Sequence, residues 1–391
     1  MANNQENDSN KIKKQKIETF YNIAKSYSKK REFEKAIKYF NKILELEPKN
    51  LKVLNRIGFI YDYEKKYEKA IETHRKILNI TPDDAEIITK IANLYKKQGA
   101  TGKAIDFYKK IIDKKPDESF PYIKIAAIYN ENKQPQKAIE FLETAIEKNP
   151  ESGEVHDRLG YAYLLMKNYE KAIEFYSKAL ELSSGDLEAY KNIGNVFYKQ
   201  KKYSKAFEYF QQALELDEEN VEVLKSLGKV SFINNDNKKA KKYFNKILEV
   251  DANNLQAHKF IGLINKKQKK YLDSIKSFRK CLSIDSKNAE IVNLIGDVYF
   301  DREHYSKAID YYRRAIKIEP NKALYYNNIA KSYLITKKED KAIENYNKAI
   351  EIEPNNIATY KNLGKLYNKK HQYKKAISVY QKAVELNPED P

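Results

Sequence analysis

This chain repeats itself at a strict interval of 34 residues. A period between about 20 and 50 residues indicates stacked repeats, each a small supersecondary unit, in place of separate globular domains. The interval is set by an alanine that recurs without insertion or deletion and that only Ser274 replaces: Ala36, Ala70, Ala104, Ala138, Ala172, Ala206, Ala240, Ala308, Ala342 and Ala376.

Eleven units of this length fill the chain from Ile17 to Asp390, and we number the positions of each unit from 1 to 34. A polar leader, residues 1–16, precedes them, and we expect it to be disordered. The predicted units are 17–50, 51–84, 85–118, 119–152, 153–186, 187–220, 221–254, 255–288, 289–322, 323–356 and 357–390.

Each unit carries the apolar spacing of two amphipathic helices. Positions 4, 7, 8 and 11 are apolar or small, and positions 20, 21, 24, 27 and 28 repeat that pattern on a second helix. Position 8 is always glycine or alanine. A glycine inside a helix costs up to about 1 kcal/mol relative to alanine, so we expect close helix packing to offset that cost. Proline at position 32 of seven units predicts the end of the second helix.

The order of these residues resembles the tetratricopeptide repeat: an apolar residue at position 4, a small one at 8, an aromatic at 11, alanine at 20, an aromatic at 24 and proline at 32. The resemblance covers residues 17–390, and the constant interval excludes the longer pentatricopeptide repeats that bind RNA. It implies an all-α fold, a right-handed superhelical solenoid of eleven helix-turn-helix repeats. The first helix of each repeat would line the concave surface.

The composition favours a cytoplasmic protein. Hydrophobic residues make up 41% of the chain and charged residues 33%, so it can bury a core and stay soluble. No apolar run approaches the length of about 18 residues that spans a bilayer, which predicts no membrane insertion. The amino terminus lacks the apolar core of a secretion signal. Cys281 is the only cysteine, so no internal disulfide can form.

A net charge of +19 raises the alternative of polyanion or RNA binding through a lysine-rich face. Only eight of the 74 basic residues are arginine, the side chain that specific phosphate and base recognition favours. The chain is also rich in Lys, Asn, Ile and Tyr, whose codons are A/T-rich, so a low-GC genome explains the charge. Nucleic acid is therefore a disfavoured partner.

No motif predicts catalysis, a cofactor or a metal ion. Of the 32 tyrosines, 23 occupy packing positions, so the repeat itself explains them. His74, His156 and His258 stand where other units place aromatic or aliphatic residues, which favours packing over metal ligation. Cys281 is expected to be a small buried residue. We therefore predict a non-catalytic scaffold, or alternatively the targeting module of an enzyme whose catalytic domain is absent from this chain.

The tetratricopeptide resemblance implies that positions 2, 5, 9, 12 and 13 face the groove, where a protein or peptide would bind. In the central units these positions carry large apolar groups with lysines between them, which leaves an acidic ligand open. The alternative is that these side chains pack between neighbouring repeats. The candidate groove residues are Tyr161, Leu164, Leu165, Lys191, Asn192, Asn195, Tyr198, Lys225, Lys229, Phe232, Ile233, Lys259, Leu263 and Phe300.

Family members that hold the acidic tails of heat-shock chaperones use a clamp spread over three repeats. Lys191 and Asn195 match its opening pair, but Ser226 and Phe260 replace later members, which disfavours that ligand. Asn192 matches one member of the asparagine ladder found in protein O-linked N-acetylglucosamine transferases, but only four units carry asparagine at that position.

Two further expectations concern stability. Units seven and eight lack the position-32 proline and the position-11 aromatic, and unit seven has Lys241 in an aliphatic column, so we expect a softer segment near residues 221–288. The chain stops without the polar capping helix that usually closes a solenoid. Either the last repeat tolerates exposure, or another domain, a partner or self-association covers it.

Overall fold

The computed structural model describes residues 2–183 and 186–387, and within them the chain forms 22 α-helices and no strand. Met1, residues 184–185 of the fifth predicted unit, 388–390 of the last unit and Pro391 lie outside the described residues. The first helices of the repeats are α1 (Ala2–Lys29), α3 (Leu51–Tyr63), α5 (Ala85–Lys97), α7 (Ser119–Glu131), α9 (Gly153–Leu165), α11 (Leu187–Lys199), α13 (Val221–Ile233), α15 (Leu255–Lys267), α17 (Ala289–Asp301), α19 (Ala323–Ile335) and α21 (Ile357–Lys369). The second helices are α2 (Phe33–Leu46), α4 (Tyr67–Ile80), α6 (Thr101–Lys114), α8 (Pro135–Lys148), α10 (Tyr169–Leu182), α12 (Tyr203–Leu216), α14 (Asn237–Val250), α16 (Tyr271–Ile284), α18 (Tyr305–Ile318), α20 (Glu339–Ile352) and α22 (Tyr373–Leu386).

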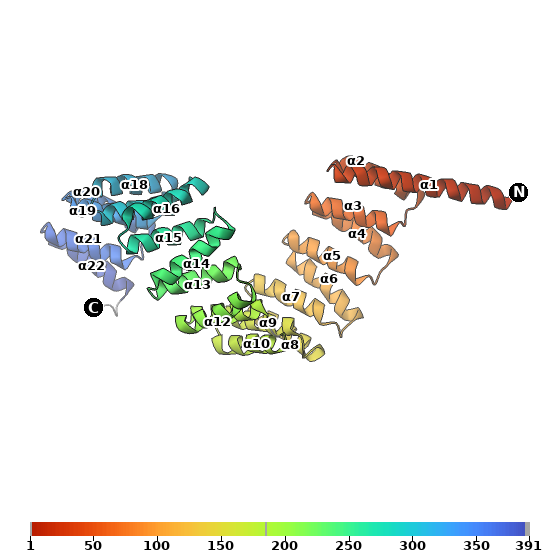
Figure 1. Cartoon of the computed structure of the whole chain (residues 1–391), viewed down its shortest axis with the longest axis horizontal. Helices are drawn as coiled ribbons and strands as arrows, with labels where there is room; N and C mark the ends of the chain where they lie inside the picture. The colour runs from red at the N-terminus through yellow and green to blue at the C-terminus, as the bar shows by residue number, and fades with distance from the viewer. Residues whose placement is uncertain (1, 184–185, 388–391) are drawn as a thin grey trace. The chain divides into compact units, whose positions relative to one another are not determined.

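The all-α fold of helical hairpins in series is confirmed. The chain divides into two compact units, Met1–Val196 and Phe197–Pro391, with the division inside α11. Within each unit, consecutive helices form hairpins, and each hairpin packs on the next one along the chain (Figure 1). Buried clusters therefore join neighbouring repeats: Phe40 of α2 lies in one cluster with Ile57 of α3, and Phe244 of α14 in another with Ile261 of α15.

Short polar side chains start most of the first helices. Position 34 is the N-cap, where Asn50 accepts a hydrogen bond from the backbone N–H of Val53 at 3.1 Å, and Asn220 accepts one from Val223 at 3.2 Å. Such a cap satisfies one of the free N–H groups at a helix start. The side chains that cap first helices in this way are Asn50, Asp84, Ser152, Asp186, Asn220, Asn254, Asn288 and Asn356.

The turn inside each hairpin requires a left-handed residue at position 15. Gly99 adopts it with φ 77°, but the other ten repeats use residues with side chains, such as Lys65 at φ 59° and Asn235 at φ 64°. A side chain in this region is strained by roughly 1 kcal/mol or more, so the packing of both helices must hold the turn.

The position-8 glycines lie beneath the rings at position 24. A Cβ added to Gly160 would stand 2.7 Å from the ring of Tyr176, and one added to Gly228 would stand 2.8 Å from Phe244. Position 8 must therefore be small because the second helix presses a large side chain against it, as close packing predicts.

The leader differs from the sequence-based expectation. Helix α1 begins at Ala2, so residues 2–16, predicted to be disordered, continue the first helix of the first repeat. This segment has neither proline nor glycine. Once the repeat has formed a helix, nothing in the backbone interrupts its extension towards the amino terminus.

Candidate functional site

In the compact unit Met1–Val196, the predicted groove residues of α9 differ in exposure. Tyr161 is 44% exposed and Leu165 40% exposed, whereas Leu164 is half-buried. Tyr161 and Leu165 are four residues apart, so they lie on one face of the helix. These two apolar side chains therefore reach solvent side by side.

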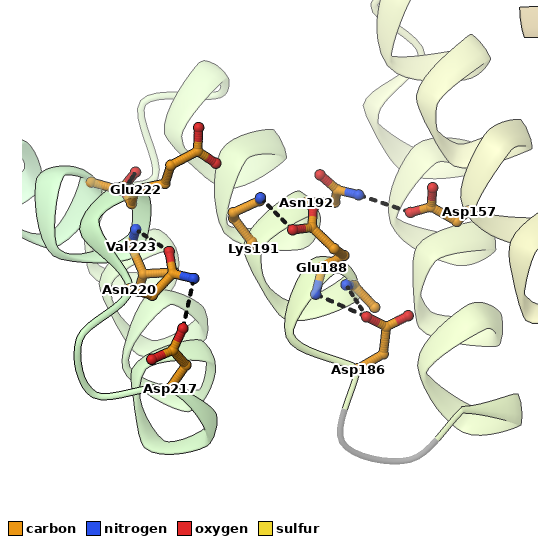
Figure 2. Close-up of polar contacts among 11 residues, drawn as sticks. Asp157, Asp186, Glu188, Lys191, Asn192, Asp217, Asn220, Glu222 and Val223 are labelled. Atoms are coloured by element: carbon orange, nitrogen blue, oxygen red, sulfur yellow. Dashed lines mark hydrogen bonds and ion pairs between the residues drawn. The ribbon is translucent and has the colours of Figure 1, made fainter. Parts of the chain in front are cut away.

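The polar groove residues predicted on α11 form hydrogen bonds and ion pairs with other residues of the compact unit Met1–Val196. Lys191 Nζ forms an ion pair of 2.6 Å with Oε1 of Glu188, and the Asn192 amide donates a 2.8 Å hydrogen bond to Oδ1 of Asp157 on α9 (Figure 2). Burial raises the pKa of Asp157, and the hydrogen bond from Asn192 opposes that rise. Asn195 is half-buried. Asn192 thus connects two repeats, in agreement with the packing alternative for this residue.

In the compact unit Phe197–Pro391, three predicted groove lysines on α13 and α15 are half-buried. Burial lowers the pKa of Lys229, and the positive charges of Lys225 and Lys259 lower it further. Lys229 Nζ lies 5.9 Å from the ring centroid of Phe260, while Lys259 Nζ pairs with Oε1 of Glu290 at 2.6 Å. Among the residues that the structure describes, Lys229 therefore has an aromatic neighbour and no carboxylate partner.

The predicted residues at position 12 pack within or between repeats. Tyr198 meets Tyr203 edge-on, with ring centroids 5.6 Å apart, and Phe300 meets Tyr305 in the same way at 5.4 Å. Phe232 contacts the Phe260 ring of the next repeat at 5.8 Å.

The remaining two predicted groove residues, Leu263 at position 9 and Ile233 at position 13, differ in exposure. Leu263 is half-buried against the cluster around Phe278, whereas Ile233 is exposed. The exposed part of the predicted groove is therefore Tyr161 and Leu165 in the fifth repeat and Ile233 in the seventh.

The structure also contains a pocket that sequence reasoning missed. It has a volume of about 630 Å³ and lies between α3, α4 and α5. Phe59, which is 63% exposed, lines it together with Leu94, Arg56 and Lys90. His74 of α4 also lines it, although the whole residue is only 4% exposed. The sequence feature that could have predicted this pocket is an aromatic residue at position 9 together with a histidine at position 24 of the same repeat.

The His74 ring is held in an unusual state. Nδ1 is buried and has no hydrogen-bond partner. The pKa of His74 is lowered to about 4, mainly by burial and in smaller part by the charge of Lys90, while the charge of Asp62 opposes the change. The imidazole is therefore neutral at pH 7, with one nitrogen as donor and the other as acceptor.

Groups with catalytic potential are either buried or scattered. Burial raises the pKa of Cys281 to about 11, and its thiol contacts the carbonyl of Leu255 at 3.5 Å. Within the described residues, no three His, Cys, Asp or Glu side chains gather in a way that could hold a metal ion. Nor does any helix in that part of the chain have the length and apolar character to cross a bilayer.

Comparison with known families accounts for nearly the whole chain. Models of the tetratricopeptide repeat match residues 17–50, 51–84, 85–118, 122–152, 151–219, 197–264, 256–288 and 357–390, and a further TPR repeat model matches 296–335 and 337–370. The chain therefore belongs to the tetratricopeptide repeat family. A comparison with curated protein sequences gives no significant match.

Two solved structures show the same fold. Yeast Tom70 aligns over 96% of this chain and 92% of its own, with a TM-score of 0.52 and 17% sequence identity. A tetratricopeptide repeat protein from Parabacteroides merdae aligns over 64% of this chain and 98% of its own, with a TM-score of 0.53 and 20% identity. At these identities the likeness concerns the fold alone.

Proposed function

We propose that this protein is a non-catalytic scaffold that binds a peptide segment or partner protein along the first helices of its repeats. One observation carries the proposal: large apolar side chains stay exposed at positions 9 and 13 of these helices. The two positions lie four residues apart and so share a helix face. We use the name exposed stripe for these positions in each compact unit taken by itself: Phe59, Tyr63, Tyr161 and Leu165 in Met1–Val196, and Ile233 and Ile335 in Phe197–Pro391.

The core does not require these side chains. Packing within and between hairpins already buries positions 20 and 24, as Ala172 and Tyr176 show in the fifth repeat. Exposed apolar groups beside charged ones are typical of protein-binding surfaces. Membership of a family of interaction scaffolds supports the same conclusion.

Selection from a displayed random-peptide library tests this proposal. Peptides that bind the wild-type protein are then measured against Leu165→Asp and Ile233→Asp, each of which places a charge within the exposed stripe. Leu272→Asp is the matched control, because Leu272 is 72% exposed on a second helix. We expect a loss of about tenfold or more in affinity for a stripe variant and no change for the control. Equal losses in all three variants, or no selected peptide, would contradict the proposal.

A further inference from the structure

The pocket between α3, α4 and α5 has the features of a specific subsite. We propose that it receives one apolar side chain of a bound peptide, with a carboxylate adjacent in that peptide held by Arg56. This inference rests on the proposed scaffold function and specifies the ligand of one part of the exposed stripe. Phe59 and Leu94 supply the apolar wall, and His74 lies at the base.

Neighbouring repeats show why His74 lacks a partner. In the third repeat, the Tyr108 hydroxyl at position 24 donates to Oδ1 of Asn93 at position 9, at 2.8 Å. The ninth repeat has the same arrangement, since Tyr312 donates to Oδ1 of Asp297 at 2.8 Å. The second repeat places Phe59 at position 9, which cannot form such a bond.

The fifth repeat follows the same rule. Tyr161 occupies position 9 there, and the hydroxyl of Tyr176 at position 24 is buried without a partner. A buried polar group without a hydrogen bond costs stability. An aromatic residue at position 9 is therefore coupled to an unsatisfied group beneath it. In the second repeat the ring that carries this buried group lines an open pocket.

The three lysines that line the pocket are already paired with carboxylates. Lys97 pairs with Asp62 at 2.7 Å, and Lys96 pairs with Glu131 at 2.6 Å. Lys90 is held by Glu86 at 2.7 Å and donates to the amide oxygen of Asn55 at 3.2 Å.

Arg56 differs from these lysines, because it forms no ion pair among the described residues. Arginine binds a carboxylate with two parallel hydrogen bonds, which suits this unpaired position. A neutral His74 adds no charge of its own, so the attraction for a carboxylate comes from Arg56.

Short fluorescein-labelled peptides provide the probe. Each carries one phenylalanine in a Gly-Ser background, followed by Asp-Asp, Asn-Asn or Lys-Lys, and binding is measured by fluorescence anisotropy. We expect the Phe-Asp-Asp peptide to bind tightest, and to lose about tenfold in affinity when serine replaces its phenylalanine or asparagine its aspartates. Equal binding of the three peptides would overturn the proposal.

Three protein variants locate the contact. Arg56→Gln removes the cation, and Arg158→Gln is its matched control because Arg158 occupies the same position of the fifth repeat. Phe59→Asn copies Asn93 of the third repeat, so it removes the apolar wall and supplies a partner for His74. We expect weaker binding of the Phe-Asp-Asp peptide by Arg56→Gln and Phe59→Asn, and unchanged binding by Arg158→Gln.

His74→Phe separates a ligand contact from a structural role. Phenylalanine stands at this position in four other repeats, as Phe40, Phe210, Phe244 and Phe278, so the fold should tolerate it. The variant should unfold at a higher urea concentration while binding the Phe-Asp-Asp peptide several-fold more weakly, by roughly the contribution of one hydrogen bond. A more stable variant with unchanged affinity would show that His74 is only structural and would overturn its part in the proposal.

The outcomes also distinguish this inference from the proposed function. Library peptides that lose affinity in Leu165→Asp but not in Arg56→Gln or Phe59→Asn would refute the subsite and leave the scaffold function standing. No effect of any of these variants on any peptide would refute both. Displacement of the Phe-Asp-Asp peptide by oligouridylate, with a steep dependence on salt, would assign the site to a polyanion instead.

Discussion

The side-chain amide of Asn192 donates a hydrogen bond of 2.8 Å to Oδ1 of Asp157, one repeat earlier in the chain (Figure 2). The same pair of positions is bonded elsewhere: Asn328 donates to Asn293 at 3.0 Å, and Lys90 to Asn55 at 3.2 Å. A residue at position 6 thus bonds to position 5 of the preceding repeat. This contact acts on the interface between neighbours, where the stability of a repeat array is decided.

Replacing Asn192 with alanine should destabilise the compact unit Met1–Val196. The substitution leaves the half-buried Asp157 carboxylate without its donor, at a cost of about 1–3 kcal/mol. It should also raise the pKa of Asp157 further, because Asn192 lowers it in the wild-type protein. Asn22→Ala is the control, since Asn22 has the same position in the first repeat and its side-chain amide bonds to no other repeat among the described residues. Equal urea midpoints for the two variants would contradict this role.

Two glycine-to-alanine substitutions should change stability in opposite directions. In Gly228→Ala the new Cβ would stand 2.8 Å from the Phe244 ring, so we expect a loss of about 1–3 kcal/mol from overpacking. At Gly102 nothing lies within 4 Å of an added Cβ, so alanine should stabilise α6 by up to about 1 kcal/mol. Urea unfolding of both variants measures the difference, and a shift of the same sign in both would be inconsistent with the packing described.

His74 should make stability depend on pH. The unfolded ring takes up a proton near its ordinary pKa of 6.5, whereas the folded ring does so only near pH 4. The unfolded state therefore binds more protons between these values, and stability falls as the pH drops from 6.5 to 4, by up to about 3 kcal/mol. Carboxylates titrate in the same range, so the readout is the difference between wild type and His74→Phe. Parallel stability curves for the two proteins would refute the prediction.

The segment formed by α13 to α16 should exchange its amide hydrogens faster than the helices of the ninth and tenth repeats. The Ser231 hydroxyl is buried there without a partner, and Lys241 reaches Oδ1 of Asn265 only at 3.4 Å. Ser231→Ala removes the unsatisfied group and should slow exchange in this segment, with a gain of about 1 kcal/mol.

Ser332→Ala serves as the control, because the buried Ser332 hydroxyl already donates to the carbonyl of Asn328 at 2.9 Å. It should therefore bring no such gain. If α13 to α16 proved to be the slowest-exchanging helices of the chain, the expected softness of this segment would be wrong.

The period and the apolar spacing were sufficient to predict the hairpins, because both follow from residues that every repeat buries. The ends of the helices were harder to predict. Helix α12 ends at Leu216 without a following proline, at the same position as Leu46 in α2, which Pro48 follows. Proline therefore does not determine this end. The left-handed residue of the turn, at position 15, could not be predicted from the sequence either, because lysine and not glycine usually occupies that position.

The candidate site was predicted only in part. Sequence position identified Tyr161 and Leu165, which are exposed, but it could not distinguish them from Tyr198 and Phe300, whose rings pack on a tyrosine five residues later. The pocket beside His74 escaped prediction for a related reason. Whether a position-24 side chain finds a partner depends on the residue that the hairpin places above it, and only the folded geometry reveals that pairing.

Photocrosslinking of a selected peptide tests the central claim that the exposed stripe binds the partner. A benzophenone amino acid is placed in a library-selected peptide, and the residues it labels are identified by mass spectrometry. We predict labels on first helices, at or beside Phe59, Tyr161, Leu165 or Ile233, and loss of those labels when unlabelled peptide competes. Labels confined to second helices, for example around Leu272, would show that the exposed stripe does not bind the peptide.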